Sequence, residues 1–429
     1  MNLKHKTKVT FYNGLTTIGG PMIEVAYNDS HVLFDLGEVF KPDLELADES
    51  FQTLIDNQLI GDVPDFYDYH LTGKKLSDSH WKDSAAYISH VHLDHSKALN
   101  LLDESVKLYT GPITASMLPV LNKDGNYLLP AVGKPKNYTR PIIAAELNVP
   151  IKVGDITLEI VPSDHDAYGA TGLIIKTPDK KIAYTGDIRL HGYHPEWVEA
   201  FMHKGHGCDM LIIESTALSW PNENHSEEFT GPKNEDELID RIVKYQIDNP
   251  KRQITFNTYI SNVERILRII KDSPRKVVLS AKRAEFLKLS IGVDVAYYYL
   301  PGEDIIPILR SDLEVDYNTL LADESEFLWQ AVADFDKLKS GSLYIHSNAE
   351  PLGSFDPAYQ PFVDTLEQHQ VEVVMLRCSG HASASALEKI IRGFEPNVLV
   401  PVHSMHPELL ENPCGSRLLP ERNQVFTFE

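Results

Sequence analysis

Three histidines and an aspartate lie within six residues of this chain, in the segment HVHLDH at 90–95. Neutral imidazoles suit zinc and other first-row metals, whereas carboxylates suit harder ions and bridging positions. The segment follows an apolar run at 85–89, which we interpret as a buried strand. Side chains alternate along a strand, so the first two histidines are expected to face one side, and the next turn can bring Asp94 and His95 to a second position nearby. A polar loop with chance histidines is the alternative, because the chain has 18 histidines, but this spacing behind an apolar strand favours a metal site.

Three later apolar runs, each expected to be a strand, also end in titratable residues. Loops at strand ends are where open sheets collect their chemistry. The HVHLDH segment alone does not complete a two-metal site, which still needs another histidine, a bridging carboxylate and an outer carboxylate. The three endings provide these residue types: His165 after the run 156–161, Asp187 after the run 181–185, and Glu214 after the run 210–213.

The elements on either side of HVHLDH carry weaker signals. A helix is expected behind it, with Ser96 as its N-cap and its end near Leu102. Asp35 ends an apolar run before a glycine and, taken alone, is interpreted as a turn residue rather than a ligand. The acidic segment 41–84 is expected to contain one short helix near 51–57. It could shape a substrate entrance or cover a sheet edge, and a solvated surface excursion is the alternative.

Length and composition narrow the class of protein. A chain of 429 residues predicts two or three domains. With 42% hydrophobic and 24% charged residues it resembles soluble globular proteins, and no apolar run approaches the ~20 residues of a membrane helix. The polar start MNLKHKTK leads into a strand-like run and is not interpreted as a signal peptide.

Cysteine content and net charge bear on location and partners. Three cysteines are too few and odd in number for a disulfide framework, which fits a reducing cytoplasm. The formal net charge of −22 argues against a general nucleic-acid coat. It leaves open a local positive groove, because fields are screened within ~10 Å at moderate salt.

The pattern of apolar and polar residues changes near residue 217. From there to 371, strand-like and helix-like stretches alternate, which indicates an α/β unit with a parallel sheet. Asn234 with Glu237 three residues later resembles a capping box at the start of its first helix, and another helix is expected at 319–338. The segment has no GxGxxG or Walker sequence.

In the last segment, from residue 372, strand-like runs again end in titratable residues. Here His381 follows a strand-like run at 371–377, and His403 follows another at 397–402. Individually, such histidines are more often core or surface residues than ligands. Together with the earlier set they are better explained by one shared site.

With these motifs in order, the chain resembles the metallo-β-lactamase superfamily, and within it the β-CASP nucleases of the RNase J-like branch. The resemblance covers nearly the whole chain. It rests on HVHLDH at 90–95, S-x-H at 163–165, TGD at 185–187, EST at 214–216, CSGHA at 378–382 and PVH at 401–403.

The resemblance implies an α/β (α+β) fold, in which an αββα sandwich of two sheets flanked by helices carries an inserted α/β β-CASP domain. The first part of the metallo-β-lactamase domain is then expected at 1–216, the β-CASP insertion at 217–371, and the C-terminal part of the first domain at 372–429. Such an insertion explains why the end of the chain supplies residues to a site that begins at residue 90.

Carried over to this sequence, the resemblance implies two divalent metal ions, with zinc expected and manganese as the alternative. It implies that His90, His92 and His165 hold one ion, that Asp94, His95 and His403 hold the other, and that Asp187 bridges them. Glu214 matches the first β-CASP motif and is expected to fix a ligand imidazole by accepting its N–H. His381 matches the second motif and is expected to donate a hydrogen bond to phosphate or to protonate the leaving 3′-oxygen.

The implied function is a metal-dependent 5′→3′ exoribonuclease, with endonuclease activity left open. His403 occupies a third motif position, where RNA-acting relatives typically have His and Artemis-type DNA nucleases typically have Val. Ser347 is expected to contact substrate phosphate, and Tyr259 to stack on a base or simply to pack. The alternatives are a β-CASP DNA nuclease acting on single strands, a catalytically silent RNA-binding relative, and small-molecule hydrolysis.

Three departures from the family pattern matter. The chain lacks the extra C-terminal domain of typical RNase J proteins, so a homodimer stays an open question. The acidic segment 41–84 is longer than the corresponding loop. The Ser347-Asn348 loop lacks the glycine of the relatives, so a 5′-phosphate pocket there is expected to differ.

Overall fold

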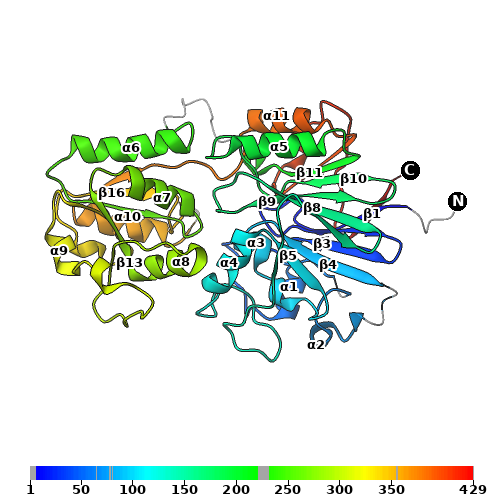
Figure 1. The fold of residues 1–429 in the computed structure, drawn as a ribbon, viewed down its shortest axis with the longest axis horizontal. Helices are drawn as coiled ribbons and strands as arrows, with labels where there is room; N and C mark the ends of the chain where they lie inside the picture. Colours follow the sequence, from blue (N-terminus) through cyan, green and yellow to red (C-terminus); the bar gives the residue numbers. More distant parts are fainter. Residues whose placement is uncertain are drawn as a thin grey trace. The chain divides into compact units, whose positions relative to one another are not determined.

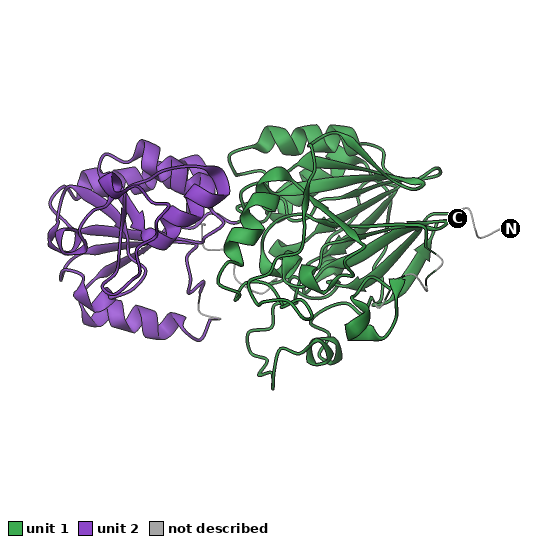
Figure 2. Ribbon diagram, turned by 60° about the horizontal axis from the view of Figure 1, so that its bottom comes forward, with its two compact units in different colours: residues 1–225, 380–429 green, residues 226–379 purple. Residues whose placement is uncertain are grey.

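Across residues 6–63, 65–76, 79, 81–220, 231–353 and 356–428, which the computed structural model describes, the chain forms two seven-stranded sheets and one six-stranded sheet (Figure 1). The chain divides into two compact units (Figure 2). Unit 1 comprises residues 1–225 and 380–429, and unit 2 comprises residues 226–379. The divisions fall somewhat later in the chain than the expected starts at 217 and 372.

The first sheet of unit 1 is mixed, and its strands follow the alternating or continuous apolar runs of the sequence. Strands β1 to β3 pair antiparallel, whereas β3 to β6 run parallel. In sheet order the strands are β20 (Gln424–Thr427), β1 (Lys8–Asn13), β2 (Met22–Tyr27), β3 (Ser30–Phe34), β4 (Asp83–Ile88), β5 (Lys107–Thr110) and β6 (Ile143–Ala144).

The second sheet of unit 1 joins segments that are far apart in the sequence. Strand β18, near the end of the chain, pairs in parallel with β11, and β11 pairs in parallel with β10. In sheet order the strands are β19 (Ser416–Arg417), β18 (Val398–Val402), β11 (Met210–Glu214), β10 (Lys181–Tyr184), β9 (Thr171–Lys176), β8 (Ile156–Pro162) and β7 (Pro150–Val153).

The two sheets of unit 1 pack face to face. One buried apolar cluster contains Phe34 and Tyr87 from the first sheet with Ile160 and Ile212 from the second. Burial of such side chains stabilises the sandwich by about 25 cal/mol per Å² of apolar surface removed from water. The outer face of the second sheet is covered by α5 (Pro195–Gly205) and α11 (Ala384–Phe394), which lie side by side in Figure 1.

Segment 41–84 is partly a cover for the first sheet. It contains α1 (Phe51–Asp56), as expected, and α2 (Tyr69–Thr72). The hydroxyl of Tyr67, a fully buried residue, donates to the Gly61 carbonyl at 2.6 Å and lies 3.5 Å from the sulfur of Met22 on β2. Residues 41–50 are mostly exposed, so this first part fits the alternative of a solvated surface excursion.

The structure corrects the expected helix behind HVHLDH. A single turn, α3 (Leu93–Ser96), is followed by a short 3-10 helix at Leu99–Leu101, and the N-cap of α3 is His92 rather than Ser96. The hydroxyl of Ser96 instead donates to the backbone carbonyls of Val91 and His92, so it stabilises the turn from inside. Farther on, the chain forms α4 (Pro112–Leu121).

Unit 2 is an α/β unit with a parallel sheet, as predicted. Asn234 caps α6 by accepting a hydrogen bond from the Glu237 backbone N–H at 2.8 Å. The sheet order is β14 (Tyr297–Tyr298), β13 (Lys276–Ser280), β15 (Phe327–Gln330), β12 (Ile254–Thr258), β16 (Leu343–Ser347) and β17 (Glu372–Met375). The helices are α6 (Glu235–Asp248), α7 (Val263–Asp272), α8 (Ala281–Ile291), α9 (Tyr317–Ala322) and α10 (Tyr359–Gln368).

The expected helix at 319–338 is wrong. Helix α9 ends at Ala322, and β15 then runs through the middle of the sheet between β13 and β12. Asp323 stops the helix, because its carboxylate accepts hydrogen bonds from the backbone N–H groups of Ser325, Glu326 and Phe327. All four β15 residues are buried, so sheet pairing outweighs the helical pattern of their neighbours.

The predicted fold class is confirmed: a two-sheet sandwich flanked by helices, with an additional α/β unit. In the part of the chain that the structure describes, no helix is long and apolar enough to span a lipid bilayer.

Candidate metal centre

Parallel strands gather the candidate residues at one edge of each sheet in unit 1. Strands β3 and β4 run in the same direction, as do β10, β11 and β18, and β8 shares the direction of β10 because both pair antiparallel with β9. The residues at the carboxyl ends are Asp35 after β3, His90 and His92 after β4, His165 after β8, Asp187 after β10, Glu214 at the end of β11, and His403 after β18.

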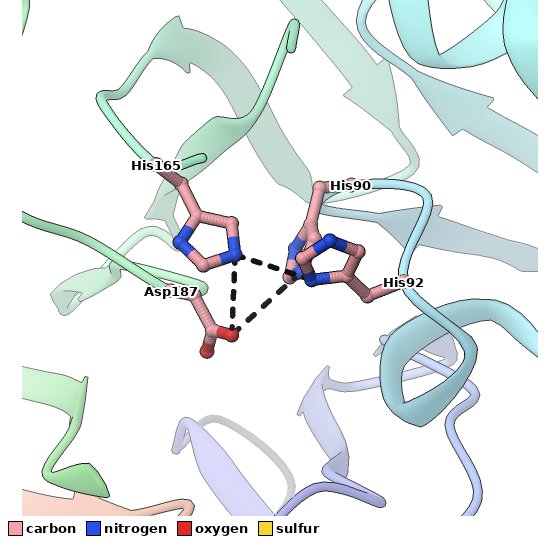
Figure 3. Close-up of side chains that lie close together, drawn as sticks. All are labelled: His90, His92, His165 and Asp187. Carbon is pink, nitrogen blue, oxygen red and sulfur yellow. Dashed lines mark hydrogen bonds and ion pairs between the residues drawn. The ribbon is translucent and has the colours of Figure 1, made fainter. Parts of the chain in front are cut away.

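Four of these residues form a first group, shown in Figure 3: His90, His92, His165 and Asp187. Each offers one nitrogen or oxygen atom, and these atoms all lie within 4.8 Å of one another. Asp187 Oδ2 lies 3.6 Å from His90 Nε2 and 3.7 Å from His165 Nε2. His165 Nε2 lies 3.2 Å from His92 Nδ1.

Asp94, His95 and His403 form the second group, with their donor atoms also within 4.8 Å of one another. His403 Nε2 lies 3.0 Å from Asp94 Oδ2. Asp187 faces both groups, because its Oδ1 lies 3.3 Å from His95 Nε2 while its Oδ2 faces the first group. The structure thus brings together all seven residues that the sequence analysis assigned to two ions, and it places Asp187 between the two sets. Their assignment as ligands stays a prediction.

The outer nitrogen of four imidazoles is held by a neighbour, which turns the inner nitrogen toward the cluster. The partners of Nδ1 are Ser89 Oγ for His90 (2.9 Å), Asp35 Oδ2 for His95 (2.8 Å), the Gly380 carbonyl for His165 (2.5 Å) and Thr216 Oγ1 for His403 (2.8 Å). Such contacts orient metal-binding imidazoles and fix their tautomer.

The hydroxyl partners define the tautomers of two imidazoles. Ser89 Oγ donates to Asp35 Oδ2 and Thr216 Oγ1 donates to the His403 carbonyl, so in each case the imidazole Nδ1 is the donor. Nε2 of the neutral ring therefore carries the lone pair that a metal ion requires.

Asp35 is the functional residue that the sequence analysis missed. This fully buried carboxylate accepts hydrogen bonds from the Ser89 backbone N–H (2.7 Å), the Ser89 hydroxyl (2.8 Å), His95 Nδ1 (2.8 Å) and the Tyr184 hydroxyl (2.5 Å). It adopts φ 53°, a left-handed conformation that Asp tolerates better than most residues. Its signal in the sequence was the one used for His165 and Asp187, a titratable residue at the end of an apolar strand.

The buried nitrogen and oxygen atoms between the two groups of candidate ligands are suited to bind a cation. Within the described residues, His90 Nε2, His95 Nε2 and Asp187 Oδ1 are buried and make no hydrogen bond. Unpaired buried polar atoms are costly, and the lone pair of the neutral His90 ring is compatible with the Asp187 carboxylate when a positive ion lies between them. Neutral imidazoles and carboxylates are the donors that zinc and manganese accept.

Burial and mutual charge set the protonation of the cluster. Burial lowers the pKa of His90 well below its usual value and lowers that of His165 to about 4, so both rings are neutral at pH 7. Burial raises the pKa of Asp187, but His403 and His95 outweigh it and bring that pKa well below the usual value. Burial lowers the pKa of His95, but the charges of Asp187, Asp35 and Asp94 outweigh it and raise that pKa well above its usual value, so His95 has to lose a proton before it binds a metal ion.

His381 and Glu214 lie next to Asp187. His381 Nδ1 is 3.4 Å from Glu214 Oε1 and 3.7 Å from Asp187 Oδ2. Burial lowers the pKa of His381, but the charges of Glu214 and Asp187 outweigh it and raise the pKa to about 10. His381 is therefore cationic at neutral pH when only the protein's own charges act on it.

Glu214 has other partners than the expected ligand imidazole. Its carboxylate accepts hydrogen bonds from the backbone N–H groups of Thr216 (2.8 Å) and Ala382 (3.2 Å). The imidazole that it faces is His381, which belongs to neither group of candidate ligands. Through these hydrogen bonds, Glu214 connects the end of β11 to the segment that contains His381.

Two of the three expected substrate contacts, Ser347 and Tyr259, belong to unit 2. Ser347 is fully buried, and its hydroxyl lies 3.3 Å from Arg265 Nη1. Arg265 is itself paired with buried Glu235 at 2.6 Å. Tyr259 is partly exposed, and its backbone carbonyl accepts a hydrogen bond from Arg283. Substrate contact by Ser347 and Tyr259 stays a prediction.

Comparisons with known proteins agree with this fold and site. Residues 71–235 match the model of the beta-lactamase superfamily domain. Ribonuclease J of Mycoplasma genitalium is 22% identical over 96% of this chain and 71% of its own length, and Ribonuclease J of Pyrococcus abyssi is 22% identical over 92% of this chain and 89% of its own.

A solved structure extends the similarity over the whole chain. A crystal structure of a protein of unknown function from Enterococcus faecalis V583 superimposes with a TM-score of 0.94 and 47% identity, covering 99% of this chain and 100% of the other. Residues 71–235 are thus similar to the metallo-β-lactamase superfamily. Nearly the whole chain is similar to proteins named Ribonuclease J.

Proposed function

We propose that this chain is a metal-dependent ribonuclease of RNase J type that degrades RNA from the 5′ end. The observation that carries the proposal is the convergence of six imidazoles and carboxylates, from segments as distant as 90–95 and His403, around Asp187. The similarity to Ribonuclease J proteins supports RNA as the substrate class.

His90, His92, His165 and Asp187 would hold one divalent ion, and Asp94, His95, His403 and Asp187 the other. Two such ions lower the pKa of a bound water and stabilise charge on a phosphodiester under attack. Zinc is the first candidate because imidazoles dominate, and manganese is the alternative because carboxylates contribute. Proton transfer and hydrogen bonding to the phosphate would be carried out by the protein's own side chains.

His381 is the candidate general acid of the site. Its imidazole is held by the negative charges of Glu214 and Asp187, with Nδ1 within 3.4 Å and 3.7 Å of their oxygens. A protonated imidazole can donate a hydrogen bond to a phosphate oxygen or transfer a proton to the leaving 3′-oxygen. Glu214 keeps that imidazole oriented through its bonds to the backbone of Thr216 and Ala382.

Unit 2 is proposed to be a β-CASP domain inserted into the first domain, and to contribute single-strand binding. Its parallel sheet and the position of residues 226–379 in the chain support this. A cytoplasmic location belongs to the same proposal, supported by three free cysteines, Cys208, Cys378 and Cys414.

The test is a cleavage assay with 5′- and 3′-labelled RNA and DNA of one sequence, carrying 5′-monophosphate or 5′-hydroxyl ends, in zinc or manganese. We expect RNA to be degraded from the 5′ end in a metal-dependent manner, with Asp187→Asn as the inactive control. A strong preference for DNA would favour the β-CASP DNA nuclease. RNA binding without cleavage under both metals would favour a silent RNA-binding relative, and either result would refute the proposal.

A further inference from the structure

Asp166, next to His165, lies at the edge of the first metal group without belonging to the predicted ligand set. Its Oδ1 lies 3.3 Å from His165 Nε2 and 4.0 Å from His92 Nε2. The side chain is 12% exposed, so it is shielded from bulk water. A carboxylate this close to a ligand nitrogen is either a partner of the same ion or a repulsive neighbour.

The tautomer of His165 argues for a shared ion. Nδ1 donates to the Gly380 carbonyl at 2.5 Å, since a carbonyl can only accept. In the neutral ring, Nε2 then presents a lone pair toward Asp166 Oδ1, His92 Nδ1 at 3.2 Å and Asp187 Oδ2 at 3.7 Å. His92 Nδ1 donates the hydrogen bond to this nitrogen, while the two carboxylate oxygens place negative charge beside it that a positive ion would offset.

The spacing agrees with two donors on one ion. Ligands bound at about 2.1 Å from zinc lie about 3.0 Å apart at a right angle and about 3.4 Å apart at a tetrahedral angle. The 3.3 Å between Asp166 Oδ1 and His165 Nε2 falls within this range, as does the 3.2 Å between His165 Nε2 and His92 Nδ1.

The two aspartates that flank His165 have different surroundings. Asp164 is saturated, because its carboxylate accepts from Arg189 Nε at 2.8 Å and from the His194 backbone N–H at 2.6 Å. Asp166 Oδ1 faces the cluster, and Gly380 leaves space for it, because a Cβ on Gly380 would lie 2.5 Å from Asp166 Oδ1. Asp164 thus holds the loop while Asp166 is directed at the candidate metal ligands.

We propose that Asp166 is a further oxygen ligand of the ion held by His90, His92, His165 and Asp187. This inference rests on the proposed function in one respect, that this group binds a metal. Asp166 is not among the four residues whose donor atoms all lie within 4.8 Å of one another, so its carboxylate has to move toward the ion on binding. A second carboxylate at this ion increases the share of oxygen ligands, which favours manganese relative to zinc.

The test compares metal binding by the wild-type chain, Asp166→Asn and a control, Asp155→Asn. Asp155 is the control because its carboxylate sits in a turn, where it accepts an exposed hydrogen bond from Asn28. The apo proteins are titrated with Zn²⁺ or Mn²⁺ against a chromogenic chelator, bound metal is counted by elemental analysis, and apo unfolding temperatures are recorded. Asp166→Ser is the second variant if the amide variant fails to fold.

We expect the wild-type and control chains to bind two ions, and Asp166→Asn to bind one of the two at least tenfold more weakly, with a larger loss for manganese than for zinc. The other ion and the apo unfolding temperature should stay unchanged. Equal weakening of both ions would indicate only a general field effect and would overturn the inference, as would unchanged affinities. A wild-type chain that binds no divalent ion would refute the metal-dependent function itself.

Discussion

Replacement of Asp35 by Asn is the sharpest test of how the scaffold supports the site. The substitution keeps the size of the side chain but removes its charge and one of its two acceptor oxygens. In the structure Oδ1 accepts one hydrogen bond, from the Ser89 backbone, and Oδ2 accepts three, from Ser89 Oγ, His95 Nδ1 and the Tyr184 hydroxyl. An amide has one oxygen, so its NH₂ group must face at least one of these donors.

The magnitude follows from the hydrogen bonds that are lost. A bond to a charged group contributes about 1.5–3 kcal/mol, and a buried donor left unsatisfied costs about 1–3 kcal/mol. We therefore expect Asp35→Asn to lower the free energy of unfolding of unit 1 by about 3 kcal/mol. Because His95 loses its orienting partner, the ion at Asp94, His95 and His403 should bind roughly 10- to 100-fold more weakly.

Tyr184→Phe is the matched control, since it removes one donor and leaves the Asp35 charge in contact with His95 and Ser89. Its expected cost is about 1 kcal/mol in stability, with metal affinity nearly unchanged. Urea unfolding followed by circular dichroism and chelator competition measure the two quantities. If Asp35→Asn binds both ions as tightly as the wild-type chain, the conclusion that Asp35 supports His95 is wrong.

Three further predictions follow from the site and from unit 2. His92→Ala and Asp187→Asn should each abolish cleavage while unfolding stays cooperative; near-native turnover in either would contradict the site assignment. His381→Ala should reduce turnover at least 100-fold while elemental analysis still finds both ions, because general acid–base groups contribute about 10²–10⁴-fold; loss of both metals would make it a structural ligand. Glu235→Ala should destabilise unit 2 by about 3–5 kcal/mol, because it leaves the buried Arg265 guanidinium without its carboxylate partner; urea unfolding that matches the wild type would show that the pair contributes little.

The candidate ligands could be predicted because the sequence marks them locally. Each of His90, His165, Asp187 and His403 stands directly behind an apolar run that forms a strand. Their convergence depends on non-local pairing, such as β11 with β18, which periodicity does not reveal. It was the order of the motifs, through the family resemblance, that linked residue 90 to His403.

Other features escaped prediction for physical reasons. Asp35 was interpreted as a turn residue because its role depends on Ser89 and Tyr184, which reach it only in the folded sheets. Segment 319–338 was expected to be one helix because the sequence does not show that β15 is held between two parallel neighbours. Glu214 was expected beside a ligand imidazole, and the structure places it beside His381, a neighbour that the sequence does not reveal.

The most direct measurement is anomalous diffraction from crystals of the metal-loaded chain, recorded above and below the absorption edge of the added metal. We predict two peaks about 3.5–4 Å apart on either side of Asp187, one beside His90 and His165 and the other beside His95 and His403. No peak at Asp187, or metal bound only elsewhere on the chain, would contradict the claim that these distant segments fold together to hold a pair of ions.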